Sequence, residues 1–183
     1  MLKIPASERW LDQLGIRLQL AGGSGQWVSP DDAQGRGSVT LEEGRILLLL
    51  AIGRNVLEIG TGLGVSTLCL EQTAESITTI DPDPWVLEHV KLPERVIRLE
   101  KIDLARGPFD LAFIDGLHDT ASVRKDIEDV RKLLHPSGLI VFHDTNQPPV
   151  RVAIDEVPWS MQLELPTSTR LMVCAENPIA RLP

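Results

Sequence analysis

The chain has 183 residues, a hydrophobic content of 43% and a formal net charge of −8. This length fits one domain with a sizeable core. The acidic balance argues against a nucleic-acid partner, because clustered lysines and arginines would be needed to neutralise phosphates. No apolar run approaches the roughly 20 residues that cross a bilayer, so no membrane association is expected. Cys69 and Cys174 both lie in apolar runs. They predict neither a disulfide framework nor a zinc site, and cytoplasmic surroundings are expected.

Within this single globular domain, residues 1–38 are predicted to form an N-terminal helix and a glycine-rich segment, and residues 39–183 the main unit. Ser7 is expected to cap a short helix that ends near Gly15. The stretch 21–38 is rich in glycine, which favours a mobile loop, and we interpret it as a lid.

The stretch Thr40-Leu41-Glu42-Glu43 matches a capping box and precedes the apolar run 46–52. A helix is therefore predicted to begin after Thr40 and to end near Gly53.

From residue 55 onward, short apolar strands alternate with helical patterns, which is typical of βαβ units and a mainly parallel sheet. Strands are predicted near 55–59, 77–81, 96–100, 110–114, 138–143, 161–165 and 170–174, the last two as an antiparallel hairpin. Helices are predicted over 65–75, 84–90, 120–134 and 150–157, the third capped by Asp119. The fold class is therefore α/β, a Rossmann-like doubly wound sheet of seven strands. The connection 101–108 is too short for a crossover helix. We expect the N-terminal helix or a second subunit, as in a homodimer, to cover that face; a plain loop is the alternative.

Three alternating glycines, Gly60, Gly62 and Gly64, follow the apolar strand that contains Glu58. Glycine allows a tight turn and a close approach to a ligand. The spacing departs from G-x-G-x-x-G/A, which disfavours a nicotinamide or flavin dinucleotide. A carboxylate at the strand end suits an amino group or a ribose hydroxyl. The loop therefore predicts an adenosine that carries an amino acid, with a bare strand-to-helix turn as the alternative.

The pattern Glu-x-Gly-x-Gly-x-Gly after an apolar strand resembles the cofactor loop of class I S-adenosylmethionine-dependent methyltransferases. The resemblance implies that S-adenosylmethionine is bound by the loop residues Glu58, Gly60, Thr61, Gly62 and Gly64.

Further cofactor contacts are predicted around this loop. Asp81 ends the next strand, 23 positions after Glu58, where an acidic residue binds ribose hydroxyls. Pro82 is expected at the adenine edge. Asp103 is expected to accept from the adenine amino group, with Leu104 donating its backbone N–H. Ser66 is expected to direct its hydroxyl or N–H at the carboxylate of the cofactor, with a plain helix cap as the alternative.

Two later strands each end in an aspartate with a histidine nearby, in Ile114-Asp115-Gly116-Leu117-His118 and Phe142-His143-Asp144. These motifs resemble a subgroup of class I methyltransferases, and the similarity spans about 39–144. The segment that begins at Thr40 also resembles the entry helix of caffeoyl-CoA and catechol type O-methyltransferases, which borders the methionine part of the cofactor. The resemblance implies that Thr40 and Asp115 contact the cofactor, and that a small-molecule acceptor is methylated at oxygen.

Those relatives hold Mg²⁺ with an Asp at the fourth strand end and an Asp-Asn pair after the fifth. Asp115 matches the first position, whereas His143-Asp144 stands where the pair is expected. Because Mg²⁺ prefers oxygen ligands, two alternatives stay open: a site made by Asp115, Asp144 and Asn146, or no metal.

Methyl transfer requires an aligned acceptor, exclusion of water and removal of one proton. His118 and His143 are the predicted catalytic bases, and Asp115 and Asp144 are predicted to orient an imidazole or the acceptor. A structural role for either histidine is the alternative.

Two other functions remain open: a non-catalytic S-adenosylmethionine-binding module and a nicotinamide-dependent oxidoreductase. Nucleobase methylation is disfavoured, because Asp115-Gly116-Leu117-His118 stands where nucleobase amino-methyltransferases carry Asn/Asp-Pro-Pro-aromatic.

Overall fold

The computed structural model describes residues 19–20, 26–28, 37–167 and 170–177. The helix predicted after Ser7 and most of the glycine-rich segment lie outside these residues. Two short strands, β1 (Gln19–Leu20) and β2 (Trp27–Val28), pair with each other, and Gln26 makes an isolated antiparallel bridge to Thr40.

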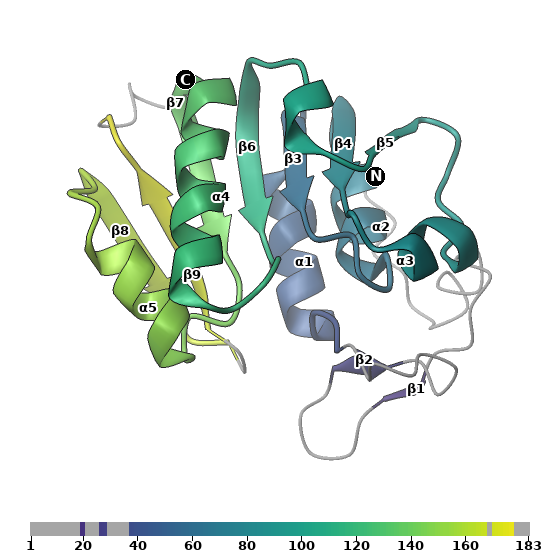
Figure 1. Cartoon of the computed structure of the whole chain (residues 1–183), viewed down its shortest axis with the longest axis horizontal. Helices are drawn as coiled ribbons and strands as arrows, with labels where there is room; N and C mark the ends of the chain where they lie inside the picture. Colours follow the sequence, from purple (N-terminus) through teal and green to yellow (C-terminus); the bar gives the residue numbers. More distant parts are fainter. Residues whose placement is uncertain (1–18, 21–25, 29–36, 168–169, 178–183) are drawn as a thin grey trace.

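The main sheet has seven strands in the order β5-β4-β3-β6-β7-β9-β8 (Figure 1). Five strands run parallel: β3 (Asn55–Ile59), β4 (Ser76–Ile80), β5 (Val96–Leu99), β6 (Phe109–Ile114) and β7 (Leu134–Phe142). The antiparallel hairpin is formed by β8 (Met161–Leu165) and β9 (Leu171–Ala175), and β9 pairs with β7. The predicted fold class, including the C-terminal hairpin, is confirmed.

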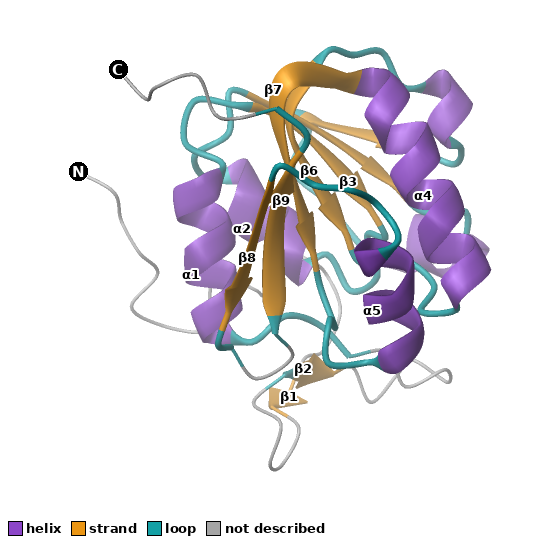
Figure 2. Cartoon of the chain, turned by 90° about the vertical axis from the view of Figure 1, so that its left-hand side faces the viewer, coloured by secondary structure: helices purple, strands orange, loops and turns teal. Residues whose placement is uncertain are grey.

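Helices cover both faces of the sheet (Figure 2). One core contains side chains of α1 (Leu41–Leu50), α2 (Val65–Glu71) and α3 (Pro84–His89). The opposite core contains the apolar stripes of α4 (Thr120–Leu133) and α5 (Pro148–Asp155). Two predicted caps are confirmed: Thr40 and Glu43 form the capping box of α1, and the Asp119 carboxylate accepts from two backbone N–H groups of α4.

The short connection after β5 forms a single 3₁₀ turn, Ile102–Leu104. Ala105 is 4% exposed and packs with Ile102 into the core on the α4 side. This turn therefore supplies part of the cover that we expected from the N-terminal helix or a second subunit. None of the helices in the described ranges is long and apolar enough to cross a membrane.

Two element boundaries differ from the sequence prediction by four residues, and the others differ by less. The strand β7 begins at Leu134 rather than at Gly138, because Leu134 pairs with Phe109 ahead of a register shift between β6 and β7. The helix α2 ends at Glu71 rather than at Glu75. Both predictions rested on apolar periodicity. The observed start of β7 is set by backbone pairing, and the observed end of α2 is set by the reversal of the chain that follows it.

Candidate functional site

Main-chain hydrogen bonds continue the sheet one residue past the carboxyl ends of its strands. The N–H of Gly60 donates to Ile80 O, and the N–H of Asp115 donates to Ile59 O, both at 2.9 Å. The N–H of His143 donates to Ile114 O at 3.1 Å. Residues that are far apart in sequence thus meet at one edge of the sheet, where open α/β sheets bind ligands.

The glycine loop joins β3 to α2 and has two distinct sides. Gly60 has a φ of +93°, and a Cβ there would lie 2.1 Å from the carbonyl oxygen of Asp115. Gly62 has a φ of +48°, and a Cβ there would meet nothing within 4 Å. Gly60 is therefore required by packing of the loop on β6, whereas Gly62 faces open space. The N–H of Gly62 donates to Asp81 Oδ2 at 2.9 Å, which ties the open side of the loop to the end of β4.

Glu58 lies behind this loop and is fully buried. Its Oε1 accepts from the Ser66 hydroxyl at 2.6 Å, and its Oε2 accepts from the hydroxyls of Thr67 at 2.5 Å and Thr79 at 2.6 Å. The Thr61 hydroxyl lies 2.7 Å from that of Thr79 and extends the chain of hydroxyls into the loop. Burial raises the pKa of the Glu58 carboxyl to about 7, although the three hydroxyl donors oppose the shift.

This network bears on three residues predicted to contact the cofactor. The carboxylate of Glu58 and the hydroxyls of Ser66 and Thr61 are engaged with one another or with Thr79 inside the protein. The backbone N–H of Ser66 is not among these bonds. Direct binding of a ligand by the three residues stays a prediction, and the geometry shows them supporting the loop.

The predicted ribose and adenine residues lie next along the same edge. Asp81 is 8% exposed, and its Oδ1 accepts from the Asp83 N–H at 2.9 Å. Pro82, Asp103 and Leu104 are exposed, the last two in the 3₁₀ turn after β5. Their adenine contacts stay predictions.

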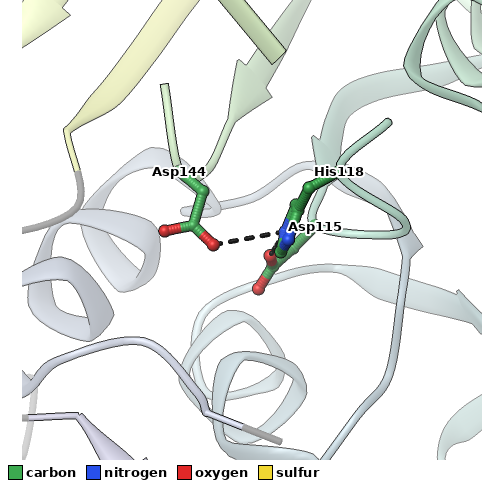
Figure 3. Close-up of side chains that lie close together, drawn as sticks. All are labelled: Asp115, His118 and Asp144. Carbon is green, nitrogen blue, oxygen red and sulfur yellow. Dashed lines mark ion pairs between the residues drawn. The ribbon is translucent and has the colours of Figure 1, made fainter. Parts of the chain in front are cut away.

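Asp115, His118 and Asp144 form a compact cluster beyond the loop (Figure 3). The His118 Nε2 lies 3.5 Å from Asp115 Oδ1 and 3.2 Å from Asp144 Oδ2. The His118 side chain is 38% exposed, so the cluster is open on this side. Asp144 has a φ of +53°, in the left-handed region, which aspartate tolerates better than most residues. The structure thus brings together three of the predicted catalytic residues, and the role of His118 as a base stays a prediction.

His143 lies on the buried side of the same cluster. Its Nδ1 is 3.2 Å from Asp115 Oδ1 and 3.5 Å from Asp144 Oδ2, while its Nε2 is 3.4 Å from Glu43 Oε2. The His143 side chain is only 2% exposed. Three carboxylates therefore surround an enclosed imidazole, which fits a fixed charge better than a base that meets an acceptor. Its role as a base stays a prediction.

Glu43 is a site residue that the sequence did not single out. It is fully buried, and its Oε2 accepts from both the N–H and the hydroxyl of Thr40 as well as facing His143. The capping box was the only feature of the sequence that pointed to Glu43, and it predicted a helix start rather than a place in the site. Thr40 is 6% exposed and is engaged in this box, so its contact with a cofactor stays a prediction.

The charges in the cluster shift the pKa values of its members. Burial would raise the pKa of Asp115, but the imidazoles of His143 and His118 outweigh it and hold that pKa well below its usual range. The Asp115 carboxylate, together with Asp144, raises the pKa of His118 despite partial burial. Burial would lower the pKa of His143, yet Asp115, Asp144 and Glu43 raise it well above its ordinary value. These carboxylates thus stabilise positive charge between them.

A divalent cation fits this cluster in donor type, with two carboxylate oxygens and one imidazole nitrogen. The set is a poorer match for Mg²⁺ than an all-oxygen set, because Mg²⁺ prefers oxygen ligands. Asn146 is exposed, and its predicted role as a ligand stays a prediction.

The strand order, the glycine loop and the acidic strand ends are those expected from the resemblance to class I methyltransferases. Residues 57–145 match a family model described as a methyltransferase domain. A protein of Mycobacterium sp. (strain JLS) named as an O-methyltransferase is 33% identical over 132 residues, covering 60% of this chain and 58% of the relative. The chain thus spans less than two thirds of that relative.

Solved structures agree on the fold. An O-methyltransferase from Bacillus cereus in complex with SAH has a TM-score of 0.59 at 21% identity, covering 75% of this chain and 82% of the other. The O-methyltransferase TomG from Streptomyces achromogenes, in complex with SAM, has a TM-score of 0.60 at 17% identity, covering 75% and 81%. The resemblance to class I methyltransferases is confirmed for the fold and for residues 57–145.

Proposed function

We propose that the chain transfers a methyl group from S-adenosylmethionine to an oxygen of a small-molecule acceptor. The observation that carries this proposal is the open side of the glycine loop at Gly62, bonded to Asp81 and facing the edge that also bears Asp115 and His118. The methyltransferase match over 57–145 and the O-methyltransferase names of the relatives support it.

The chain's own residues divide into a cofactor side and an acceptor side. On the cofactor side, Gly62 leaves room for the ligand, and Asp81 supplies a carboxylate for ribose hydroxyls. On the acceptor side, the partly exposed His118 and the carboxylates of Asp115 and Asp144 can hold a hydroxyl and receive its proton. A cation held by the carboxylates of Asp115 and Asp144 would supply positive charge that favours the deprotonated acceptor.

The predicted division into an N-terminal segment, 1–38, and a unit over 39–183 stays a prediction. The bridge from Gln26 to Thr40 and the 5% exposure of Trp27, which packs in the same core as α1, support close association of residues 26–28 with that unit. A cytoplasmic location, a homodimer and the absence of a nucleic-acid partner also stay predictions.

Asp81→Asn is expected to weaken the binding of S-adenosylhomocysteine at least about tenfold, because one acceptor for the ribose hydroxyls becomes a donor. Isothermal titration calorimetry measures the effect. Asp110→Asn is the matched control: Asp110 also accepts a backbone N–H, from Asn55 at 3.0 Å, but it lies at the opposite end of the sheet. Wild-type protein that binds NAD and not S-adenosylhomocysteine would instead support the oxidoreductase alternative.

His118→Ala is expected to lower turnover at least about 100-fold while leaving the affinity for S-adenosylhomocysteine nearly unchanged. Formation of S-adenosylhomocysteine is followed with a panel of phenolic acceptors. His135→Ala is the control, since His135 is exposed near the start of β7, away from the carboxyl edge. Cofactor binding without turnover of any acceptor would favour a non-catalytic binding module.

A further inference from the structure

We infer that Asp115, His118 and Asp144 form a binding site for a divalent transition-metal cation, with His118 Nε2 as one of the ligands. This goes beyond the proposed methyl transfer, because it assigns an atom of His118 to the cation and names the class of cation. The site is defined without the cofactor, so it can be tested without any methyl acceptor.

The two separations from His118 Nε2 match those of neighbouring ligands around one ion, and all three ligand atoms lie within 4.8 Å of one another. Metal–ligand bonds of about 2.0–2.3 Å place neighbouring ligand atoms about 3–3.7 Å apart in octahedral or tetrahedral geometry. The His118 Nε2 lies 3.5 Å and 3.2 Å from the two carboxylate oxygens. This nitrogen is buried, yet it is aligned for a hydrogen bond with neither oxygen. Its position therefore fits a shared ion better than a directed hydrogen bond.

The far side of the His118 ring is held by a second residue. The Gln147 side-chain amide lies 3.4 Å from His118 Nδ1. A metal-ligating histidine usually donates its other N–H to an oxygen, and the amide of Gln147 presents its oxygen when it is turned about its last torsion. Gln147 thus fixes the ring so that Nε2 points into the cluster.

The charge of the cluster also suits a divalent ion. The cluster contributes two carboxylate side chains, Asp115 and Asp144, and one imidazole, His118. An imidazole nitrogen beside two carboxylates selects Mn²⁺, Co²⁺ or Zn²⁺ over Mg²⁺, because nitrogen ligands suit transition metals.

This assignment differs from the ligand set expected by resemblance. There Asn146 was the third ligand, whereas here His118 takes that place. In this arrangement, His118 holds the cation and does not receive the proton of the acceptor, so a loss of turnover in a His118 variant follows from loss of the cation.

The test titrates the full chain, without a histidine tag or cofactor, with Mn²⁺ and follows free Mn²⁺ by electron paramagnetic resonance. We expect His118→Gln to raise the Kd for Mn²⁺ at least about tenfold. We expect Asn146→Ala and His135→Gln to stay close to wild type. Unchanged binding of S-adenosylhomocysteine by His118→Gln would show that this variant is folded.

Two spectroscopic readouts test the nitrogen ligand itself. Bound Co²⁺ should give a visible absorption spectrum in the wild type that changes in His118→Gln. His118→Asp should reduce the preference for Co²⁺ over Mg²⁺, because it makes an all-oxygen set.

Failure of the wild type to bind Mn²⁺ and Co²⁺ would overturn the proposal. So would His118→Gln that binds Mn²⁺ as tightly as wild type, or Asn146→Ala that loses as much affinity as His118→Gln. None of these results bears on whether the chain binds S-adenosylhomocysteine, so the two proposals fail separately.

Discussion

Gly60→Ala is expected to destabilise the fold by at least about 4 kcal/mol, a large part of the total stability of a typical domain. The added Cβ would lie 2.1 Å from the carbonyl oxygen of Asp115, and the residue would be held at a φ of +93°. The Asp115 backbone cannot move away at low cost, because its N–H is held by the hydrogen bond to Ile59 O. Chemical denaturation followed by circular dichroism measures the loss. A variant as stable as wild type would mean that the loop is not packed on β6 as described.

Gly62→Ala separates binding from folding in the same loop. Its φ of +48° costs an alanine about 1–2 kcal/mol, but its Cβ would enter open space. Gly53→Ala is the matched control, since Gly53 has a φ of +64°, also lacks neighbours within 4 Å and follows α1 away from the loop. We expect both variants to lose similar stability. Only Gly62→Ala should weaken the binding of S-adenosylhomocysteine, as calorimetry would show.

Glu58 is expected to make the free energy of unfolding fall as the pH rises from about 4.5 to 7. The folded pKa of about 7 lies above the ordinary value of 4.5, so the folded state retains a proton that the unfolded state releases. The stabilisation is complete below pH 4.5 and is lost as the pH passes 7. A shift of this size corresponds to up to about 3 kcal/mol.

Glu58→Gln provides the comparison, because glutamine is neutral throughout this range. Other groups titrate in the same window, among them Asp126 with a pKa raised by burial to about 6, so the useful quantity is the difference between wild type and variant. Denaturant unfolding at pH 5, 6, 7 and 8 gives that difference. We expect the wild type to lose stability relative to Glu58→Gln as the pH rises. Parallel curves for the two proteins would contradict a protonated Glu58 in the folded state.

Much of the fold could be predicted because its signals are local. Short apolar strands separated by amphipathic helices gave the parallel sheet and the C-terminal hairpin, and the capping residues Thr40 and Asp119 located two helix starts. The start of β7 could not be predicted, since Leu134 joins the strand by pairing with Phe109 rather than through its own sequence pattern. Likewise, the 3₁₀ turn 102–104 is defined by the packing of Ile102 against the core on the α4 side of the sheet.

The sequence predicted which residues meet at the carboxyl edge of the sheet, because parallel strands bring their carboxyl ends together. The directions of the side chains were not. Glu58 reads as a ligand-binding carboxylate in sequence, yet its oxygens accept from hydroxyls of α2 and β4. Glu43 reads as a helix cap, and only the tertiary structure brings it to His143, 100 residues later.

The main-chain bonds that extend the sheet past its strand ends have a consequence for the proposed acceptor side of the site. The backbone N–H groups of Asp115 and His143 are bonded to the ends of neighbouring strands. Substitutions in the loop that follows Asp115 therefore need not move these two backbone positions. Leu117 lies between Asp115 and His118 and is 72% exposed. Under the proposed methyl transfer, variation at Leu117 would change the acceptor preference without moving the cluster, which makes Leu117 a first position to randomise in directed evolution.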